Sequence, residues 1–389
     1  MSAIAGTHVD EVLERAVESG TVPNVVATAA NADGPIYEAA FGPRAVGKAD
    51  GVTVDTLYRI ASMTKLVTTT AALQLVERGQ LDLDAPVADY RPEFKDLQVL
   101  DGWNGDEPIL RAPSSQATVR QLATHTSGLS YWFWNEDILK WESVTSTGNT
   151  LAGTADAFTA PLVADPGTRF EYGCNTDWLG RVVEAASGQS LDAYFDEHIT
   201  GPLEMHEATF HPSDQQRENL VAVHLRGRES NQWEATDLDW NAAPDFWAGG
   251  HGLYCPPSEY LRFQRMLLNQ GTLDGTQILA AETVRAAFSN QIGDLSFPAE
   301  IRTAEPPTSA DFNAGPGYKF GLGLLLNEAD APGMRRAGSG AWAGIFNTHF
   351  WVDPSTGITG ALYTQTLPFV EPSVFQVYID FETALYASL

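Results

Sequence analysis

The sequence predicts an α/β fold in which one antiparallel sheet is flanked by helices from both ends of the chain. Three observations favour it. The chain opens with an amphipathic helix followed by a hairpin pattern, and it closes with two strand patterns followed by a helix. Between these ends lies a long, mainly helical stretch. We therefore expect strands from the two ends to join in one sheet, with a mostly helical subdomain inserted between them.

The amino-terminal elements follow from simple residue patterns. Residues 8–19 place their apolar side chains on one helical stripe, and Gly20 ends the pattern. Residues 24–30 and 36–41 then read as a hairpin around the turn at 31–34. These elements would form one edge of the sheet and a helix on its face.

The carboxyl-terminal elements mirror this arrangement. Strands are predicted near 345–352 and 358–365, and a final helix near 372–387. The whole chain, 1–389, is expected to be one catalytic unit. Within it, 1–63 and 205–389 would form an α/β subdomain and 64–204 a mainly helical one, with a site at their junction.

Composition narrows the class of protein. The 389 residues carry a net charge of -27, which disfavours nucleic acid as a partner because its phosphates would be repelled. No apolar run reaches the roughly 18 residues of a membrane span, and no secretion signal is visible, so we expect a cytoplasmic location and no membrane partner. Cys174 and Cys255 are expected to be free thiols. Oligomeric state is left open, and the acidic surface fits salt adaptation and coding bias equally well.

The most informative motif is Ser62-Met63-Thr64-Lys65, an S-x-x-K at the start of a long apolar helical run. Three residues is about one helical turn, so Ser62 and Lys65 fall on one face. A serine hydroxyl needs a neighbouring base to act as a nucleophile, and a lysine amine can provide one. The structural alternative is an N-capping serine with a solvated lysine.

Two further segments carry chemistry. Phe170 to Asn175 reads as a loop that ends in an asparagine helix cap, and Tyr172 within it can act as a base or proton relay at a cleft. Its alternative is a tyrosine on the rim of the cleft. Trp342 to Ile345 reads as a turn that leads into a strand, for which the alternative is an ordinary hairpin.

In this order the three segments resemble the serine β-lactamase superfamily, and most closely class C β-lactamases, family VIII carboxylesterases and the related statin side-chain acyltransferases. Further matches to the family's patterns are L-x-T-H-T-S-G-L at 122–129 and A-G-G-x-G-L at 248–253, and Pro202-Leu203-Glu204-Met205 followed by Thr209 resembles the family's P-L-G-M-x-x-T. The resemblance implies a β-lactamase/transpeptidase-like fold.

It also implies roles for individual residues. Ser62 would be the nucleophile, Lys65 and Tyr172 would share the role of base, and the backbone N–H groups of Ser62 and Ile345 would form the oxyanion hole. Substrate-binding residues are expected among the aromatic cluster after the H-T-S-G-L loop, the tyrosine and third motifs, and a nearby loop: Tyr131, Trp132, Trp134, Asn175, Asp245, Trp247, Trp342 and Gly344.

Two departures from the family pattern bear on the substrate. Asn175 lies three residues after Tyr172 instead of two, which leaves a helix cap as its alternative role. Trp342-Ala343-Gly344 replaces the K-T-G that would bind a β-lactam carboxylate, although Arg335 and Arg336 lie upstream. We therefore expect a small to medium uncharged ester as substrate.

The sequence thus predicts a serine carboxylesterase that works through an acyl-enzyme on Ser62. The alternatives are an acyltransferase on the same scaffold, a β-lactamase or penicillin-binding type of enzyme, and a noncatalytic β-lactam sensor. No G-x-S-x-G or H-E-x-x-H occurs, the eight histidines lack the spacing of metal ligands, and no cofactor is indicated.

Overall fold

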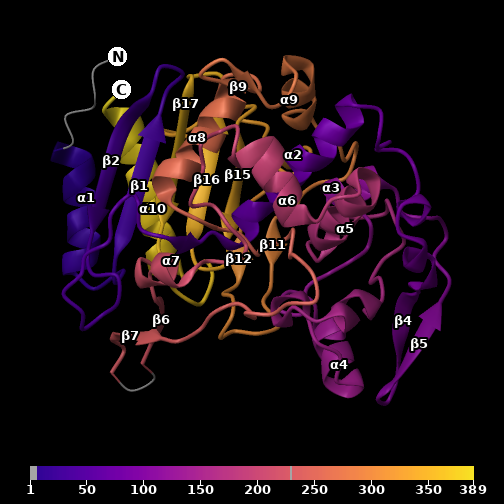
Figure 1. The fold of residues 1–389 in the computed structure, drawn as a ribbon. Coiled ribbons are helices and arrows are strands. Elements are labelled where there is room, and N and C mark those ends of the chain that lie inside the picture. Colours follow the sequence, from indigo (N-terminus) through magenta and orange to yellow (C-terminus); the bar gives the residue numbers. More distant parts are fainter. Residues whose placement is uncertain (1–6, 228–229) are drawn as a thin grey trace.

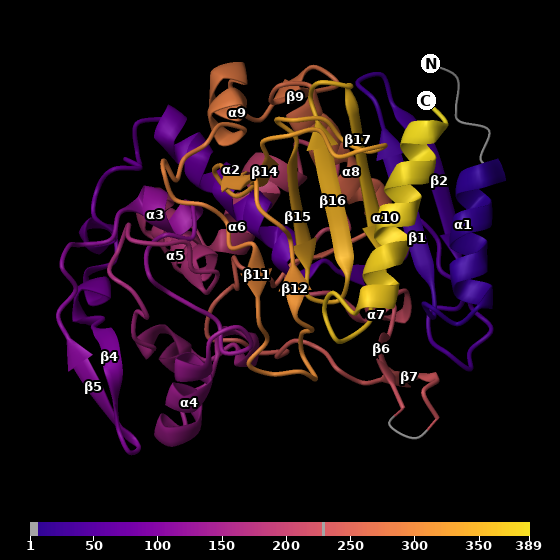
Figure 2. The same cartoon turned by 180° about the vertical axis from the view of Figure 1, so that it is seen from behind.

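A seven-stranded antiparallel sheet organises the computed structural model, which describes residues 7–227 and 230–389 (Figures 1 and 2). The strand order is β13-β14-β15-β16-β17-β1-β2. The strands are β1 (Val25–Ala30), β2 (Pro35–Phe41), β13 (Tyr318–Phe320), β14 (Leu325–Asn327), β15 (Gly340–Gly344), β16 (Thr348–Asp353) and β17 (Ile358–Tyr363).

Strands from the two ends of the chain pair with each other within this sheet. β1 pairs antiparallel with β17, in a register that sets Val26 opposite Tyr363 and Ala30 opposite Thr359. The prediction that strands from both ends join in one antiparallel sheet is therefore confirmed.

Helices cover both faces of the sheet. α1 (Thr7–Glu18) and α10 (Pro372–Ala387) lie together on one face, and α8 (Pro257–Leu268) lies on the other (Figures 1 and 2). Successive side chains of β1 point to opposite faces of the sheet. Val26 therefore belongs to the hydrophobic core on the α8 side, and Ala27 belongs to the core that contains α1 and α10.

α2 (Thr64–Glu77) has no solvent-facing stripe over most of its length and packs against α5 and α6. The helices around and beyond it are α3 (Val119–Ala123), α4 (Glu136–Thr145), α5 (Asn175–Ser187), α6 (Leu191–Phe195), α7 (Asp214–Glu218) and α9 (Ala281–Ala287). The shorter strands pair outside the main sheet: β3 (Tyr58–Arg59), β4 (Val99–Asn104), β5 (Glu107–Arg111), β6 (Val223–Arg226), β7 (Trp233–Thr236), β8 (Tyr254–Cys255), β9 (Thr272–Leu273), β10 (Thr276–Gln277), β11 (Glu300–Ile301) and β12 (Phe312–Asn313).

One segment that was predicted to be a turn is part of a strand in the structure. We expected a turn at Trp342–Ile345, but Trp342 to Gly344 belong to β15, where Ala343 pairs with His349. The turn comes later and contains Asn347, whose φ of 59° is left-handed. Asparagine tolerates that region better than most residues, so it can close the hairpin.

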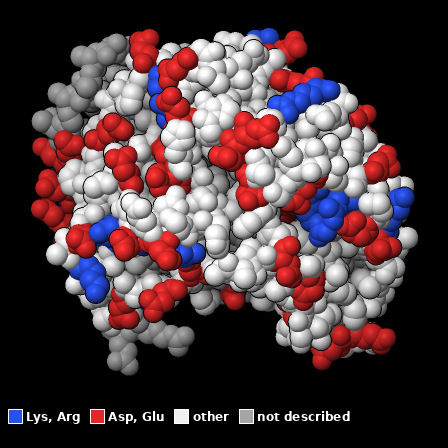
Figure 3. Space-filling model, in the orientation of Figure 1, with Lys and Arg blue, Asp and Glu red and all other residues white. Residues whose placement is uncertain are grey.

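The surface is strongly acidic. Figure 3 shows Asp and Glu side chains spread over the visible face, with few Lys and Arg side chains among them. In the part of the chain that the structure describes, no helix has both the length and the apolar character needed to cross a membrane.

Candidate active site

Ser62 lies in a short 3₁₀ turn, Ala61–Met63, immediately before α2. The sequence placed it in the first turn of that helix. The turn departs from the helix because Ala61 adopts a φ of 47°, a strained conformation for a residue with a Cβ. The Ser62 side chain thereby reaches the cavity described below, although the residue is only 9% exposed.

Lys65 is buried and contacts three oxygen atoms. Its Nζ lies 3.1 Å from Ser62 Oγ, 3.1 Å from the Tyr131 hydroxyl and 2.7 Å from the Gly250 carbonyl oxygen. The S-x-x-K spacing therefore brings its two polar groups together on one face, and the lysine is not solvated.

Tyr131 connects Lys65 to a buried carboxylate. Its hydroxyl donates to Asp177 Oδ2 at 3.2 Å, while Asp177 Oδ1 accepts from the Gly250 N–H at 2.9 Å. A Cβ at Gly250 would overlap the Asp177 carboxylate, so glycine permits this approach. We expected Tyr131 on the pocket wall; it instead lies behind Lys65.

Burial sets the protonation of this network. It raises the pKa of Asp177, an effect that the charge of Lys65 opposes. Burial also raises the pKa of the Tyr131 phenol well above its usual value, and the neighbouring Asp177 adds to the rise. The Tyr131 phenol therefore stays protonated, and its hydroxyl donates a hydrogen bond to Asp177. The pKa of His251 falls to about 3 through burial and the charge of Lys65, so its ring, 3.7 Å from Asp177, is neutral.

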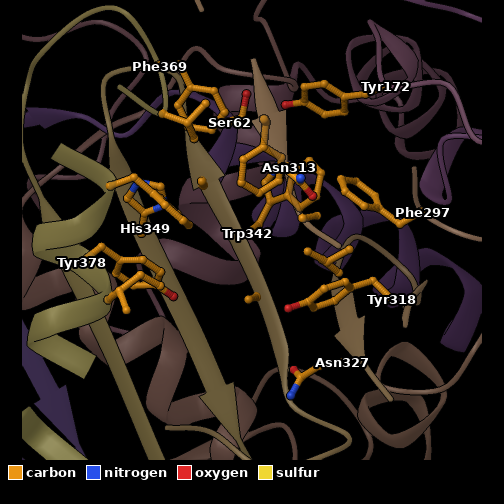
Figure 4. Close-up of a pocket in the computed structure, with 18 of the residues that line it drawn as sticks. Ser62, Tyr172, Phe297, Asn313, Tyr318, Asn327, Trp342, His349, Phe369 and Tyr378 are labelled. Atoms are coloured by element: carbon orange, nitrogen blue, oxygen red, sulfur yellow. The ribbon is translucent and has the colours of Figure 1, made fainter. Parts of the chain in front are cut away.

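Tyr172 packs edge-on against Tyr131, with ring centroids 5.2 Å apart, and lies near Lys65 and Ser62. Its ring centroid lies 4.8 Å from Lys65 Nζ, and its ring packs edge-on against Trp342 at 5.1 Å. Figure 4 shows its hydroxyl pointing toward Ser62. The structure therefore brings the side chains of Ser62, Lys65 and Tyr172 close together.

The end of β15 packs directly on the Ser62 turn. A Cβ at Gly344 would collide with the Ile60 carbonyl oxygen and with Thr348 Oγ1, so only glycine lets the strand come this close. Ile345 follows and lines the cavity beside Ser62. Within the described ranges, no turn or loop hydrogen bond uses the N–H of Ile345.

Ser62 opens into a cavity of about 320 Å³ that runs along β15 (Figure 4). Ser62 and Tyr172 lie at one end and Asn327 at the other. Most of the lining is aromatic or aliphatic: Phe133, Trp134, Phe297, Phe312, Ala314, Tyr318, Leu325, Ala331, Met334, Ala341, Trp342, Ala343, Ile345, Phe369, Val370, Phe375, Tyr378 and Ile379.

The predicted substrate-binding residues divide into two groups. Trp134 and Trp342 line this cavity. Asp245 and Trp247 line a separate hollow instead, because their loop lies against Arg181 and Glu184 of α5. Trp132 turns its indole N–H to Glu305 at 2.9 Å and does not line the cavity.

Asn175 and Gly344 also differ from the expectation of substrate contact. Asn175 is fully buried, and its amide bonds the Leu129 and Glu171 carbonyl oxygens and the Ser127 hydroxyl. It is also not the helix cap, because Cys174 occupies that position. Gly344 packs on the turn that holds Ser62 and lies outside the cavity lining.

The cations near the cavity are already paired. Arg335 lines it, but its guanidinium bonds Glu382 and the Tyr378 hydroxyl. Arg336 pairs with Asp330 at 3.1 Å, where both side chains are largely exposed. Within the described residues, no three His, Cys, Asp or Glu side chains gather as a metal site would require.

Comparison with known proteins places this geometry in a family. A model described as Beta-lactamase matches residues 9–384. The chain belongs to this family. Monacolin J acid methylbutanoyltransferase from Aspergillus terreus is 30% identical, with 96% of this chain and 94% of that protein covered. Lovastatin esterase from Penicillium rubens is 30% identical, with 90% of each covered.

Solved structures agree on the fold. A mutant of simvastatin synthase (LovD) from Aspergillus terreus superposes with a TM-score of 0.85 at 29% identity, covering 100% of this chain and 98% of that one. EstCE1, a hydrolase with promiscuous acyltransferase activity, gives a TM-score of 0.79 at 21% identity with 98% of each chain covered, and it bears on the fold alone. The predicted superfamily and its β-lactamase/transpeptidase-like α/β fold are confirmed.

Proposed function

We propose that this family member is a serine carboxylesterase for small to medium uncharged esters. The observation that carries the proposal is the position of Ser62, whose hydroxyl lies 3.1 Å from a buried lysine at one end of a largely apolar cavity. A nucleophile beside a base, at one end of a largely apolar cavity, suits acyl transfer.

The reaction would proceed in two steps. Ser62 Oγ attacks the ester carbonyl carbon as its proton passes to the pair Lys65 and Tyr172, and the N–H groups of Ser62 and Ile345 stabilise the oxyanion. The carbon–oxygen bond to the alcohol then breaks, and the alcohol leaves with that proton. Water attacks the acyl-enzyme, returns a proton to Ser62 and releases the acid.

The cavity favours an uncharged substrate. Trp342 occupies the position where the K-T-G motif would place a lysine, and Arg335 is already neutralised by Glu382. A carboxylate in this cavity would be buried without a free cation, which costs several kcal/mol. An uncharged ester avoids that penalty and can bury its apolar part against the aromatic lining.

A second candidate is an acyltransferase that passes the acyl group to an alcohol. It is favoured by relatives named as methylbutanoyltransferases, one of which is alignable over 96% of this chain. Both activities share the acyl-enzyme and differ only in the acceptor that enters next.

A product analysis separates the two. We expect purified protein to release p-nitrophenol from short acyl p-nitrophenyl esters and to yield mainly free acid even when a competing alcohol is present. Mainly transesterified product at modest alcohol concentration would favour the acyltransferase. No release from any ester, by protein shown to be folded, would contradict both.

A further inference from the structure

The floor of the cavity is made of small side chains. Ala341 and Ala343 lie on the same face of β15, and Ile345 continues that row, because alternate residues of a strand share a face. The row spans about 13 Å, since each residue of a strand rises about 3.3 Å. A chain attached at the Ser62 end can therefore lie along β15.

Polar side chains interrupt the cavity lining at several places, and one of them lies beside this row. His349 lies opposite Ala343 on β16, lines the cavity and is only 4% exposed. Tyr378 stacks on its ring at 4.6 Å and Phe369 at 6.0 Å (Figure 4). Its Nε2 is buried without any hydrogen-bond partner in the described chain.

Other buried histidines of the described chain also have an unpaired ring nitrogen, but His349 is the one among them that lines the cavity. Buried polar atoms are nearly always hydrogen-bonded, because leaving one unpaired forfeits its interaction with water. A neutral imidazole offers one donor and one acceptor. Burial and the charge of Arg335 lower the pKa of His349 to about 3, so the ring is neutral near pH 7 and can play both parts.

The charges around His349 define what it can bind. Arg335, the nearest cation, is held by Glu382 and Tyr378. A carboxylate beside His349 would bring a second negative charge to a buried space whose only cation in the described residues is already matched. An uncharged oxygen adds no charge and can hydrogen-bond a ring nitrogen of His349 that the cavity exposes.

We propose that His349 forms a specificity subsite for a hydroxyl, ketone or ether oxygen on the limb of the ester that lies along β15. This inference rests on the proposed ester chemistry and names the kind of ester. Since His349 is level with Ala343, two residues from Ile345, the oxygen would lie a few bonds from the carbonyl carbon and not at the end of a long chain.

Two positional series test it. In one, p-nitrophenyl alkanoates of fixed length carry a hydroxyl at successive carbons; in the other, acetates of fixed-length alcohols carry it on the alcohol. At one position of one series, kcat/KM should exceed that of the plain ester by roughly tenfold, the effect of one good hydrogen bond. The series that responds identifies the limb, and two flat series would overturn the proposal.

The variant His349→Phe keeps the stacking surface and removes both nitrogen atoms. In this variant the ratio of kcat/KM for the hydroxylated ester to kcat/KM for the plain ester should fall to about one. Phe375→Leu, an apolar change in the same cavity, should change kcat/KM for both esters by the same factor and keep that ratio. A preference that survives His349→Phe would contradict the assignment.

Calorimetric binding of the same esters to Ser62→Ala gives a second readout. The hydroxylated ester should bind roughly tenfold more tightly than the plain one, and equal affinities would overturn the subsite. This readout needs no turnover. A wild-type protein that hydrolyses nothing yet shows the binding preference would therefore count against the proposed function and for the subsite.

Discussion

Tyr131 donates a hydrogen bond to Asp177 Oδ2 at 3.2 Å, and both side chains are buried behind the lysine that faces Ser62. Neither residue lines the cavity. The pair therefore holds Lys65 in place and does not hold substrate. This relationship separates the residues expected to change kcat from those expected to change KM.

Tyr131→Phe and Asp177→Asn should lower kcat by roughly 10- to 100-fold and leave KM nearly unchanged. Tyr131→Phe removes the hydrogen bonds of its hydroxyl with Lys65 and Asp177, and Asp177→Asn changes the acceptor of the second; a hydrogen bond to a charged group is worth about 1.5 to 3 kcal/mol. Steady-state kinetics on p-nitrophenyl butyrate check this. Trp132→Phe is the matched control, because Trp132 is an adjacent buried aromatic that bonds Glu305 instead of the lysine. A rise in KM at constant kcat would instead indicate that Tyr131 contacts the substrate.

Lys65→Ala and Tyr172→Phe should each lower kcat by about a thousandfold or more. The double variant should lose little beyond either single change, because groups that act as one unit are strongly non-additive. Circular dichroism establishes that the variants are folded. Near-full activity in Tyr172→Phe would make Tyr172 a rim residue.

Acidification should destabilise the protein through His224. The Val46 N–H donates to His224 Nε2 at 3.1 Å, so that nitrogen must be unprotonated in the folded state. Burial lowers the pKa of His224 to about 4, below its unfolded value of about 6.5. Between these values the unfolded state binds more protons, so stability falls as pH falls.

The contribution of His224 between pH 6.5 and 5 is about 2 kcal/mol. Urea unfolding at pH 7 and pH 5 should therefore show a smaller loss of stability on acidification in His224→Gln than in the wild type. His211→Gln is a control at an exposed histidine. An identical pH dependence in wild type and His224→Gln would refute the assignment.

Cephalosporins and penicillins should be poor substrates. Their carboxylate would enter a cavity where Trp342 replaces the usual lysine and Arg335 is already paired. We expect kcat/KM for nitrocefin to lie well below that for p-nitrophenyl butyrate. Nitrocefin values equal to or above the butyrate value would mean that a cation such as Arg335 leaves Glu382 to bind substrate.

Local patterns were sufficient for the parts of the fold that depend on nearby residues. The three-residue spacing of Ser62 and Lys65 is a property of one helical turn, and the terminal strands and helices follow from their own periodicity. The prediction placed a turn where β15 lies, because Ala343 next to Gly344 resembles a turn until its pairing with His349 is known.

The rest depends on contacts between distant segments. Asp177 carries no local signal, since its partner Tyr131 lies 46 residues away. The cavity likewise joins segments near Phe297, Tyr318 and Tyr378 that no spacing rule connects. The aromatic cluster at 131–134 was predicted as one pocket wall, but its members turn to different neighbours, and only Phe133 and Trp134 reach the cavity.

The central claim is that Ser62 is the nucleophile, and covalent labelling tests it most directly. A phosphonate ester inhibitor should inactivate the protein, and peptide mass spectrometry should locate a single adduct on Ser62, with none formed by Ser62→Ala. Removing only this hydroxyl should leave the fold intact. An adduct on Ser127 or Ser339, or ester hydrolysis that persists in folded Ser62→Ala, would contradict the account.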